Sequence, residues 1–335
     1  MHLIINTFGT ALRKDGDMIE ISRKENKQRI PIKKISSIVI GTGVQISTDI
    51  VEAALKNNID IIFLDKYGNP YGRFWHARMG STARIRRYQL ELSNHKDGIP
   101  FALQWILRKL ENQMCFLEEM VKRRTQLFTQ IHQSLDGLKK HHDQLKKMNG
   151  ELNELRGRIF GIEGNAGRVW WDIYCQFFPS SYQFKERSRQ PAKDEVNALL
   201  NYGYGILYGQ VEKAIILAGL DPYIGFIHTD NYAKVSLVFD VIEQYRIWVE
   251  QSVLTLFSKR LIKKDFFQKL ANGVALNDEG KQVFIPHLFD YLETSVRYHG
   301  REVCRKDQIQ LDMYAFAKDI LTWGTNNLER CHEKK

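Results

Sequence analysis

The chain has 335 residues, of which 43% are hydrophobic and 11% aromatic, so it can form buried cores and is not a disordered protein. Its formal net charge of +10 favours an anionic partner, either a nucleic acid or a membrane surface. No uninterrupted apolar run is long enough to span a bilayer, and no signal peptide is expected. The four cysteines form no CxxC pair, so a reducing, cytoplasmic location is the default expectation.

Residues 1–75 are predicted to form a small β-rich domain. Short stretches rich in β-branched residues are separated by turn sequences such as Lys14-Asp15-Gly16-Asp17, which is typical of short strands. One helix is expected over residues 47–56, because Ser47 or Thr48 can cap its N-terminus. The strands are expected at residues 3–5, 18–21, 35–40 and 59–64.

Residues 76–88 are predicted to link this domain to the rest of the chain. Basic residues alternate here with the aromatic residues that end the first domain, Phe74 and Trp75. Such interleaving suits contact with a polyanion, so the linker is a candidate part of a nucleic-acid track. The basic residues that we expect to bind DNA in this segment are Arg84, Arg86 and Arg87.

Residues 89–335 have helical periodicity and are predicted to form a larger all-α domain. Residues 101–147 predict one or two long amphipathic helices, with a possible break near Asp136-Gly137. Further helices are expected over residues 151–178, 194–218, 233–260 and 311–328. Because strands are followed by helices and do not alternate with them, the sequence favours an α+β multidomain protein with two segregated domains.

Asp240 and Glu243 are three residues apart in a stretch that is otherwise apolar. At helical spacing, both carboxylates lie on one face of the helix. An ordinary solvated acidic face, with Glu243 forming a local ion pair with Arg246, is the plain alternative.

His228 lies in a predicted loop twelve residues before Asp240. A single histidine is more often a packed or hydrogen-bonded residue than a metal ligand. The short separation nevertheless allows the loop and the following helix to converge. His228 is therefore a candidate for either role, as a ligand or as a proton carrier.

Glu163 lies in a segment that contains Gly164, Ala166 and Gly167. Glycine lowers helix propensity, so its presence is explained if another helix or a substrate backbone approaches closely there. A loosely formed helix start is the alternative interpretation.

Taken together, Glu163, His228, Asp240 and Glu243 supply three carboxylates and one imidazole in helix-like, apolar surroundings. Hard oxygen ligands suit Mg²⁺ or Mn²⁺, and an imidazole favours Mn²⁺ or another transition ion. Because the chain is basic, concentrated acids of this kind suggest a metal site that faces a polyanion. The rival interpretation is a non-catalytic nucleic-acid-binding scaffold, whose acids only pair with neighbouring arginines.

A further segment carries Arg187 and Arg189 shortly before Pro191. Guanidinium groups match phosphate geometry, so both arginines are candidate DNA-binding residues, with a basic loop that binds no ligand as the alternative. Asp194 can cap the helix that follows this segment.

These segments, in this order, resemble the CRISPR-associated spacer-acquisition integrase family. The matching pieces are a Glu-x-x-Ala segment that begins at Glu163, an Arg-x-Arg-x-Pro-x-x-Asp-x-x-Asn segment that begins at Arg187 with a following Tyr-Gly-Tyr, and His228 with Ser-Leu-Val-Phe-Asp-x-x-Glu-x-x-Arg. Each motif is weak alone, whereas all of them in register are specific. The resemblance covers essentially the whole chain.

The resemblance implies that Glu163, His228 and Glu243 are the metal ligands and that Asp240 is a further catalytic acid. Many family members carry Asp where Glu243 stands. Asn197, Tyr202 and Arg246 are expected to support the site. The resemblance also implies a homodimer built through the β-rich domain and assembly with a small ferredoxin-like CRISPR-associated partner.

The activity that follows from this resemblance is that of an antiviral-defence enzyme, a DNA endonuclease and integrase that uses Mg²⁺ or Mn²⁺. Its substrates would be double-stranded DNA, namely captured fragments and the CRISPR repeat. The nucleophile would be the 3′-hydroxyl of a captured fragment, or water when the enzyme only nicks. A general metal-dependent nuclease is a second alternative.

Overall fold

The computed structural model places the chain in two compact units, which are described separately. Unit 1 comprises Met1–Arg78, Ser188–Gly209 and Thr255–Tyr291, and unit 2 comprises Met79–Arg187, Gln210–Leu254 and Leu292–Lys335. The structure describes residues 2–35, 37–57, 59–65, 70–74, 83–150, 152–182, 184–228 and 234–329. Two segments that the sequence assigned to the helical domain, Ser188–Gly209 and Thr255–Tyr291, are thus grouped with the N-terminal strands.

A mixed sheet in unit 1 has the strand order β1 (His2–Ile5), β5 (Ser37–Ile40), β7 (Asp60–Leu64) and β8 (Pro70–Phe74). The first three strands are parallel, and β8 pairs antiparallel with β7. Every residue of β5 is buried, as expected for a central strand of a parallel sheet. Helix α1 (Thr48–Lys56) lies between β5 and β7 in the chain and buries Ile50.

A second sheet in unit 1 has the order β4 (Asn26–Pro31), β3 (Met18–Arg23), β2 (Ala11–Asp15) and β6 (Gln45–Ile46). Gly16 has a φ of +57°, which suits glycine in the tight turn between β2 and β3. Leu12, Ile19 and Ile30 are buried and join the core of the first sheet. The strands predicted near residues 3–5, 18–21, 35–40 and 59–64 are confirmed as β1, β3, β5 and β7.

The later segments of unit 1 pack against these strands. Arg73 Nη2 donates a hydrogen bond of 2.7 Å to the carbonyl oxygen of Gly209, in helix α6 (Glu195–Leu217). The remaining elements of this part are the hairpin β9 (Phe267–Leu270) and β10 (Gly273–Leu276), together with helix α9 (Asp278–Glu293), which continues into unit 2.

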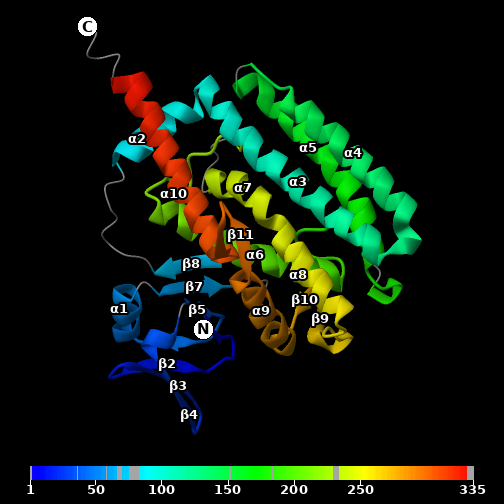
Figure 1. Cartoon of the computed structure of the whole chain (residues 1–335). Coiled ribbons are helices and arrows are strands. Elements are labelled where there is room, and N and C mark those ends of the chain that lie inside the picture. The colour runs from blue at the N-terminus through cyan, green and yellow to red at the C-terminus, as the bar shows by residue number, and fades with distance from the viewer. Residues whose placement is uncertain are drawn as a thin grey trace. The chain divides into compact units, whose positions relative to one another are not determined.

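Three long helices, α3 (Ile99–Arg123), α4 (Phe128–Lys146) and α5 (Leu152–Tyr174), lie side by side in unit 2 (Figure 1). The break between α3 and α4 falls at Arg124 (φ −130°, ψ 62°), followed by a 3₁₀ turn at Thr125–Leu127. The expected break near Gly137 was therefore wrong. Gly137 lies inside α4, where an added Cβ would stand 3.1 Å from Val169 of α5, so this glycine permits close helix packing.

The helix predicted over residues 233–260 consists of three pieces. They are α7 (Ser236–Ile242), a 3₁₀ turn at Glu243–Tyr245, and α8 (Arg246–Ser258). The other elements of unit 2 are α2 (Ala83–Ser93), the hairpin β11 (Ser295–Tyr298) and β12 (Arg301–Cys304), and α10 (Arg305–Gly324). None of the helices in the described part of the chain combines the length and apolar character needed to cross a membrane.

Candidate functional site

Two of the predicted site carboxylates converge on one cationic atom in unit 2. Lys109 Nζ, on α3, lies 2.6 Å from Glu163 Oε1 on α5 and 2.5 Å from Glu243 Oε2. Glu243 is the first residue of the 3₁₀ turn that follows α7. The packing of α3 against this turn and against α5 thus brings together residues that are 80 positions apart in the sequence.

The other oxygen of Glu243 accepts a hydrogen bond of 2.8 Å from Arg246 Nη1, so the predicted ion pair is present. Burial alone would raise the pKa of Glu243, but the charges of Arg246 and Lys109 outweigh it and lower that pKa to about 2. Burial would also lower the pKa of Lys109, yet Glu243 and Glu163 raise it above its ordinary value. Glu243 and Lys109 are therefore both charged at neutral pH.

Asp240 and His228 form a second pair next to these groups. Asp240 Oδ1 lies 2.6 Å from His228 Nδ1 and also accepts the backbone N–H of His228 at 3.0 Å. Its Oδ2 accepts the backbone N–H groups of Phe226 and Ile227, at 2.6 and 3.0 Å. Because a carboxylate only accepts, His228 Nδ1 is the donor in this contact, so Nε2 is the accepting nitrogen of the neutral imidazole.

The aromatic rings of Phe160 and Phe239 flank the His228 imidazole, with ring centroids 5.1 and 5.8 Å from it. Arg156 Nε, on α5, donates a hydrogen bond of 3.0 Å to the carbonyl oxygen of Phe226. This bond ties the loop that carries His228 to the helix that carries Glu163, so backbone and ring contacts together fix the position of the imidazole.

Glycines around Glu163 leave one face of α5 open. A Cβ added at Gly157, Gly161, Gly164 or Gly167 would meet no described atom within 4 Å. Among the described residues of this chain, no other helix approaches Gly164 or Gly167 closely, whereas Ala166 is fully buried. The open face leaves room for a substrate backbone beside Glu163.

The donor set is compatible with a divalent cation. Glu163 and Glu243 supply hard oxygen atoms within hydrogen-bonding distance of a single cationic nitrogen, and His228 is close enough to lower the pKa of Glu243. Among the described residues, no group of three or more His, Cys, Asp or Glu side chains is already arranged around one metal position. In this structure the place between the two carboxylates is taken by Lys109.

The sequence interpretation missed Lys109, although its position carried a signal. The buried residues of α3 include Trp105, Ile106 and Gln113. Lys109 lies four residues after Trp105, three after Ile106 and four before Gln113. It therefore lies on the buried face of an amphipathic helix. A lysine on such a face requires an acidic partner.

The segment after Ser188 is held by Asn197 in unit 1. Asn197 Oδ1 accepts a hydrogen bond of 2.9 Å from the backbone N–H of Ser188, and its amide nitrogen contacts Asp194 Oδ2 at 2.6 Å. The backbone N–H of Asn197 donates to Asp194 Oδ1 at 2.8 Å, so the predicted N-cap is confirmed. Asn197 thus supports the loop that carries Arg189.

The two arginines of this segment differ in surroundings. Arg187 lies over the Trp171 ring, 5.8 Å from its centroid, in unit 2. Arg189 is exposed in unit 1 and lines a cavity of about 350 Å³ together with Pro191, Asn201 and Tyr202. Tyr202 is buried, and burial raises the pKa of its hydroxyl. An exposed arginine at the rim of a hollow is suitably placed for an anionic ligand.

Arg84, Arg86 and Arg87 lie on helix α2, which begins at Ala83. The last residues of the predicted linker, 83–88, thus form the first part of this helix, in which Tyr88 and Leu92 are buried. Residues 75–82 lie outside the described residues. Arg84 Nε contacts the Tyr88 hydroxyl at 3.1 Å, and Arg87 is exposed.

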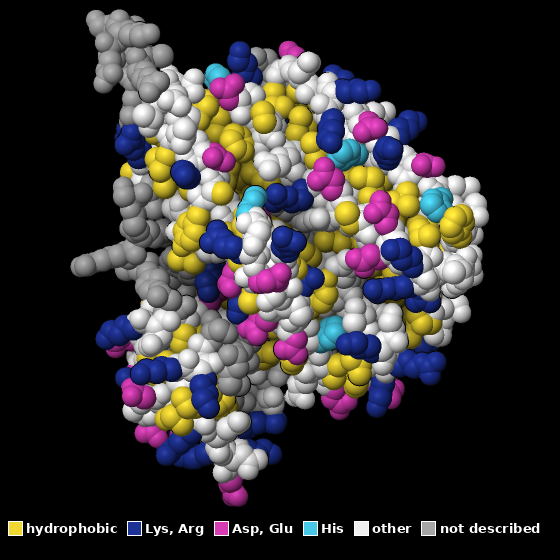
Figure 2. All heavy atoms as spheres, in the orientation of Figure 1, with side chains coloured by type: hydrophobic (Ala, Val, Ile, Leu, Met, Phe, Trp, Pro, Cys, Tyr) yellow, Lys and Arg dark blue, Asp and Glu magenta, His cyan; other side chains and the backbone are white. Residues whose placement is uncertain are grey.

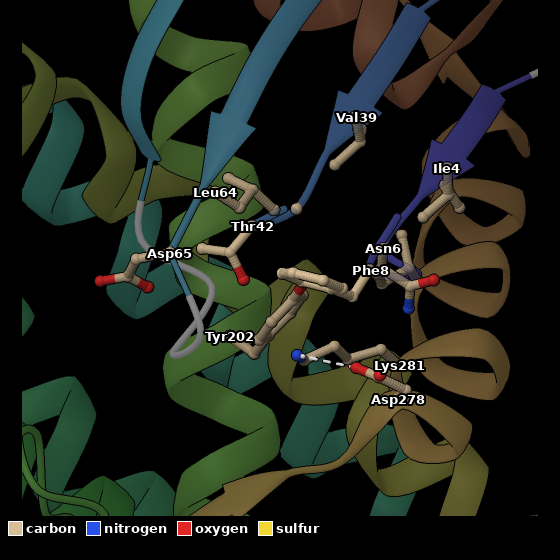
Figure 3. Close-up of a pocket in the computed structure, with 12 residues that line it drawn as sticks. Ile4, Asn6, Phe8, Val39, Thr42, Leu64, Asp65, Tyr202, Asp278 and Lys281 are labelled. Atoms are coloured by element: carbon tan, nitrogen blue, oxygen red, sulfur yellow. Dashed lines mark hydrogen bonds and ion pairs between the residues drawn. The ribbon is translucent and has the colours of Figure 1, made fainter. Parts of the chain in front are cut away.

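A smaller cavity of about 100 Å³ lies in unit 1 at the carboxyl ends of the parallel strands (Figure 3). Asn6, Thr42 and Asp65 follow β1, β5 and β7, and an ion pair of 3.4 Å between Lys281 and Asp278 borders it. Small-molecule sites usually have volumes of roughly 300–1,000 Å³. This cavity is therefore too small for a typical organic ligand.

Comparison with known proteins agrees with the fold and the motifs. The family model of the CRISPR-associated protein Cas1 matches residues 3–289. A CRISPR-associated endonuclease Cas1 of Archaeoglobus fulgidus is 34% identical over 334 residues, covering 95% of this chain and 96% of the relative. One of Thermodesulfovibrio yellowstonii is 31% identical, covering 82% and 86%. The chain therefore belongs to the Cas1 family.

Solved structures show the same fold. A casposase bound to its integration product superposes with a TM-score of 0.83 at 24% identity, covering 96% of this chain and 90% of that one. A Cas1 protein from Thermotoga maritima gives 0.77 at 22% identity, covering 96% and 97%. The β-rich N-terminal part followed by a larger helical part is thus a Cas1 architecture.

Proposed function

We propose that this protein is a divalent-metal-dependent DNA endonuclease and integrase that inserts short captured DNA into a CRISPR array. The observation that carries the proposal is the convergence of Glu163 and Glu243 on one cationic atom, beside the His228–Asp240 pair. Its family relatives are named endonucleases, and one structural neighbour is bound to an integration product, which supports the same chemistry.

Glu163, Glu243 and His228 would hold the Mg²⁺ or Mn²⁺ ion. When bound, the ion would neutralise charge on a phosphodiester during its attack by a 3′-hydroxyl or by water. Asp240 and Arg246 would support these three residues and would not hold the ion themselves. Asp240 fixes the tautomer and orientation of His228, and Arg246 balances one charge of Glu243.

Two features favour His228 Nε2 as the reactive atom of the imidazole. Nδ1 is held by the buried carboxylate of Asp240, so it is not available to a ligand. The Phe160 and Phe239 rings flank the imidazole, while its side chain remains 22% exposed. Nε2 would then bind the ion or accept a proton from the attacking oxygen.

DNA would be held by arginines outside this centre. The residues proposed are Arg187, Arg189, Arg84, Arg86 and Arg87, which would contact phosphates and position the duplex without reading its sequence. On the face shown in Figure 2, lysine and arginine side chains are spread among acidic and hydrophobic ones. The open glycine face of α5 would admit the backbone of the strand that reacts at Glu163.

The assembly proposed for this activity is a homodimer formed through unit 1, in complex with a small ferredoxin-like CRISPR-associated protein in the cytoplasm. A structural neighbour named as a Cas6-RT-Cas1–Cas2 complex, with a TM-score of 0.78 at 20% identity, contains a Cas1 fold together with partner proteins. Staggered insertion at two DNA ends requires two active sites at a fixed separation, which supports a dimer.

The test measures nicking and strand joining on a CRISPR-repeat duplex, with Mg²⁺ or Mn²⁺ and with EDTA. Glu163→Gln, His228→Ala and Glu243→Gln should each abolish both reactions while the protein stays folded. Glu293→Gln removes a carboxylate that pairs with Lys306 at 2.8 Å elsewhere in unit 2, and should retain activity. DNA binding without any cleavage by the wild-type protein would favour a scaffold, and cleavage without joining would favour a general nuclease.

A further inference from the structure

We propose that Lys109 is the resident cation of the metal-free site, which holds Glu163 and Glu243 in place until a divalent ion displaces its ammonium group. This inference rests on the metal-dependent function proposed above. It adds a residue to that function, because Lys109 belongs to none of the segments that carry the family resemblance.

The geometry makes Lys109 a bridge between the two acids. A single nitrogen contacts one oxygen of each glutamate, at 2.6 and 2.5 Å. The three side chains are only 11%, 19% and 10% exposed, in the order Lys109, Glu163 and Glu243. Without a cation between them, two poorly solvated carboxylates would repel each other at short range.

Charge balance indicates that the lysine and the ion exclude one another. Counted as formal charges, Glu163 and Glu243 contribute −2 and the two basic side chains that contact them, Lys109 and Arg246, contribute +2, so these four side chains balance. A divalent ion added without loss of a cation would leave an excess of +2 in a largely buried site, which is unfavourable. Withdrawal of one of the two basic side chains would relieve this excess.

Lys109 is better suited to withdraw than Arg246. Arg246 binds Glu243 Oε1 and lies three residues along the same stretch of chain, so it can stay while Oε2 turns to the ion. Lys109 occupies Oε2 and the facing oxygen of Glu163, which are the atoms that an ion between the acids would need. Its flexible four-carbon stem also allows the ammonium group to move without displacing α3.

The first experiment compares Lys109→Met with the wild-type chain by calorimetric titration with Mn²⁺. Lysine occupancy reduces the fraction of sites that are competent to bind, so its removal should tighten Mn²⁺ binding about tenfold. In EDTA the variant should melt at a lower temperature than wild type, and Mn²⁺ should raise its Tm by more. Lys306→Met, which breaks a Lys–Glu pair away from the site, should bind Mn²⁺ as wild type does.

A second measurement uses the wild-type protein, so it does not depend on the folding of a variant. Trace labelling with an amine-reactive reagent, read by peptide mass spectrometry, should rise at Lys109 when Mn²⁺ is added, while Lys306 labelling stays constant. A lysine that keeps its bridge with Mn²⁺ bound would label equally or less, which would overturn the proposal. An unchanged Mn²⁺ affinity in Lys109→Met would also overturn it and would leave the proposed function standing. If wild type and Glu163→Gln both fail to bind Mn²⁺, the result contradicts the proposed metal-dependent function itself and not only the role of Lys109.

Discussion

Replacing Asp240 with asparagine tests whether this buried acid controls the histidine of the site. The carboxylate accepts four hydrogen bonds, from three backbone N–H groups and from His228 Nδ1. An amide has one accepting oxygen, so two of these bonds are lost. Hydrogen bonds to a charged group contribute roughly 1.5–3 kcal/mol each, so Asp240→Asn should lower the free energy of unfolding by about 3–6 kcal/mol.

The same change should switch the tautomer of the His228 imidazole. With an amide NH₂ facing Nδ1, that nitrogen becomes the acceptor, and the ring proton moves to Nε2. His228 could then no longer bind a metal ion through Nε2, so Mn²⁺ affinity and strand joining should fall by about 10–100-fold, as is typical when the partner of a ligating histidine is removed.

Three assays separate these effects. Urea denaturation gives the free energy of unfolding, NMR of the imidazole nitrogens gives the tautomer, and titration at low temperature gives Mn²⁺ affinity for the folded fraction. Asp312→Asn is the matched control, because Asp312 accepts hydrogen bonds from the hydroxyls of Tyr245 and Tyr298, at 2.6 and 2.8 Å. It should be destabilised without a change of tautomer or affinity. Wild-type stability and an Nδ1–H tautomer in Asp240→Asn would refute the reasoning.

Three further changes have defined outcomes. Arg187→Ala and Arg189→Ala should each reduce the log–log salt slope of DNA binding by about one unit, and an unchanged slope in a filter-binding titration would give both a structural role. Gly137→Ala should destabilise the protein by about 1–3 kcal/mol because its methyl group meets α5 at 3.1 Å, whereas Gly164→Ala should stabilise it by up to about 1 kcal/mol in the same denaturation assay. Because the pKa of Glu243 is lowered to about 2, its contribution to stability should be present above about pH 4.5 and lost as the pH falls toward 2; Glu243→Gln should show a flatter acid unfolding curve.

Local sequence patterns were sufficient to predict a helix, strand or turn whose structure depends only on its own residues. The strand β3 with its isoleucines, the capping of α6 by Asp194 and the turn at Gly16 could all be recognised from neighbouring residues. The break between α3 and α4 was not, because low helix propensity at Gly137 was outweighed by packing against Val169. Propensity differences of about 1 kcal/mol are easily overridden by tertiary contacts.

The sequence also could not predict which distant segments come together in the fold. Glu163, His228, Asp240 and Glu243 were identified as candidates from their residue types and motifs, but the pattern could not show which of them meet. The structure joins them as two pairs. It also groups Ser188–Gly209 with the N-terminal strands, a contact between distant segments that no periodicity encodes.

The two pairs differ in how their charge is stabilised, and this difference separates their roles. Asp240 is held by backbone N–H groups, which cannot leave, so its orientation of His228 is a fixed property of the fold. Glu163 and Glu243 are held by side chains, and one of these, Lys109, contacts both acids through a single atom. A cation that is bound by side chains can be exchanged for another cation. The exchangeable part of the site is therefore the space between the two glutamates, while the imidazole beside it is already oriented before any metal ion or DNA arrives.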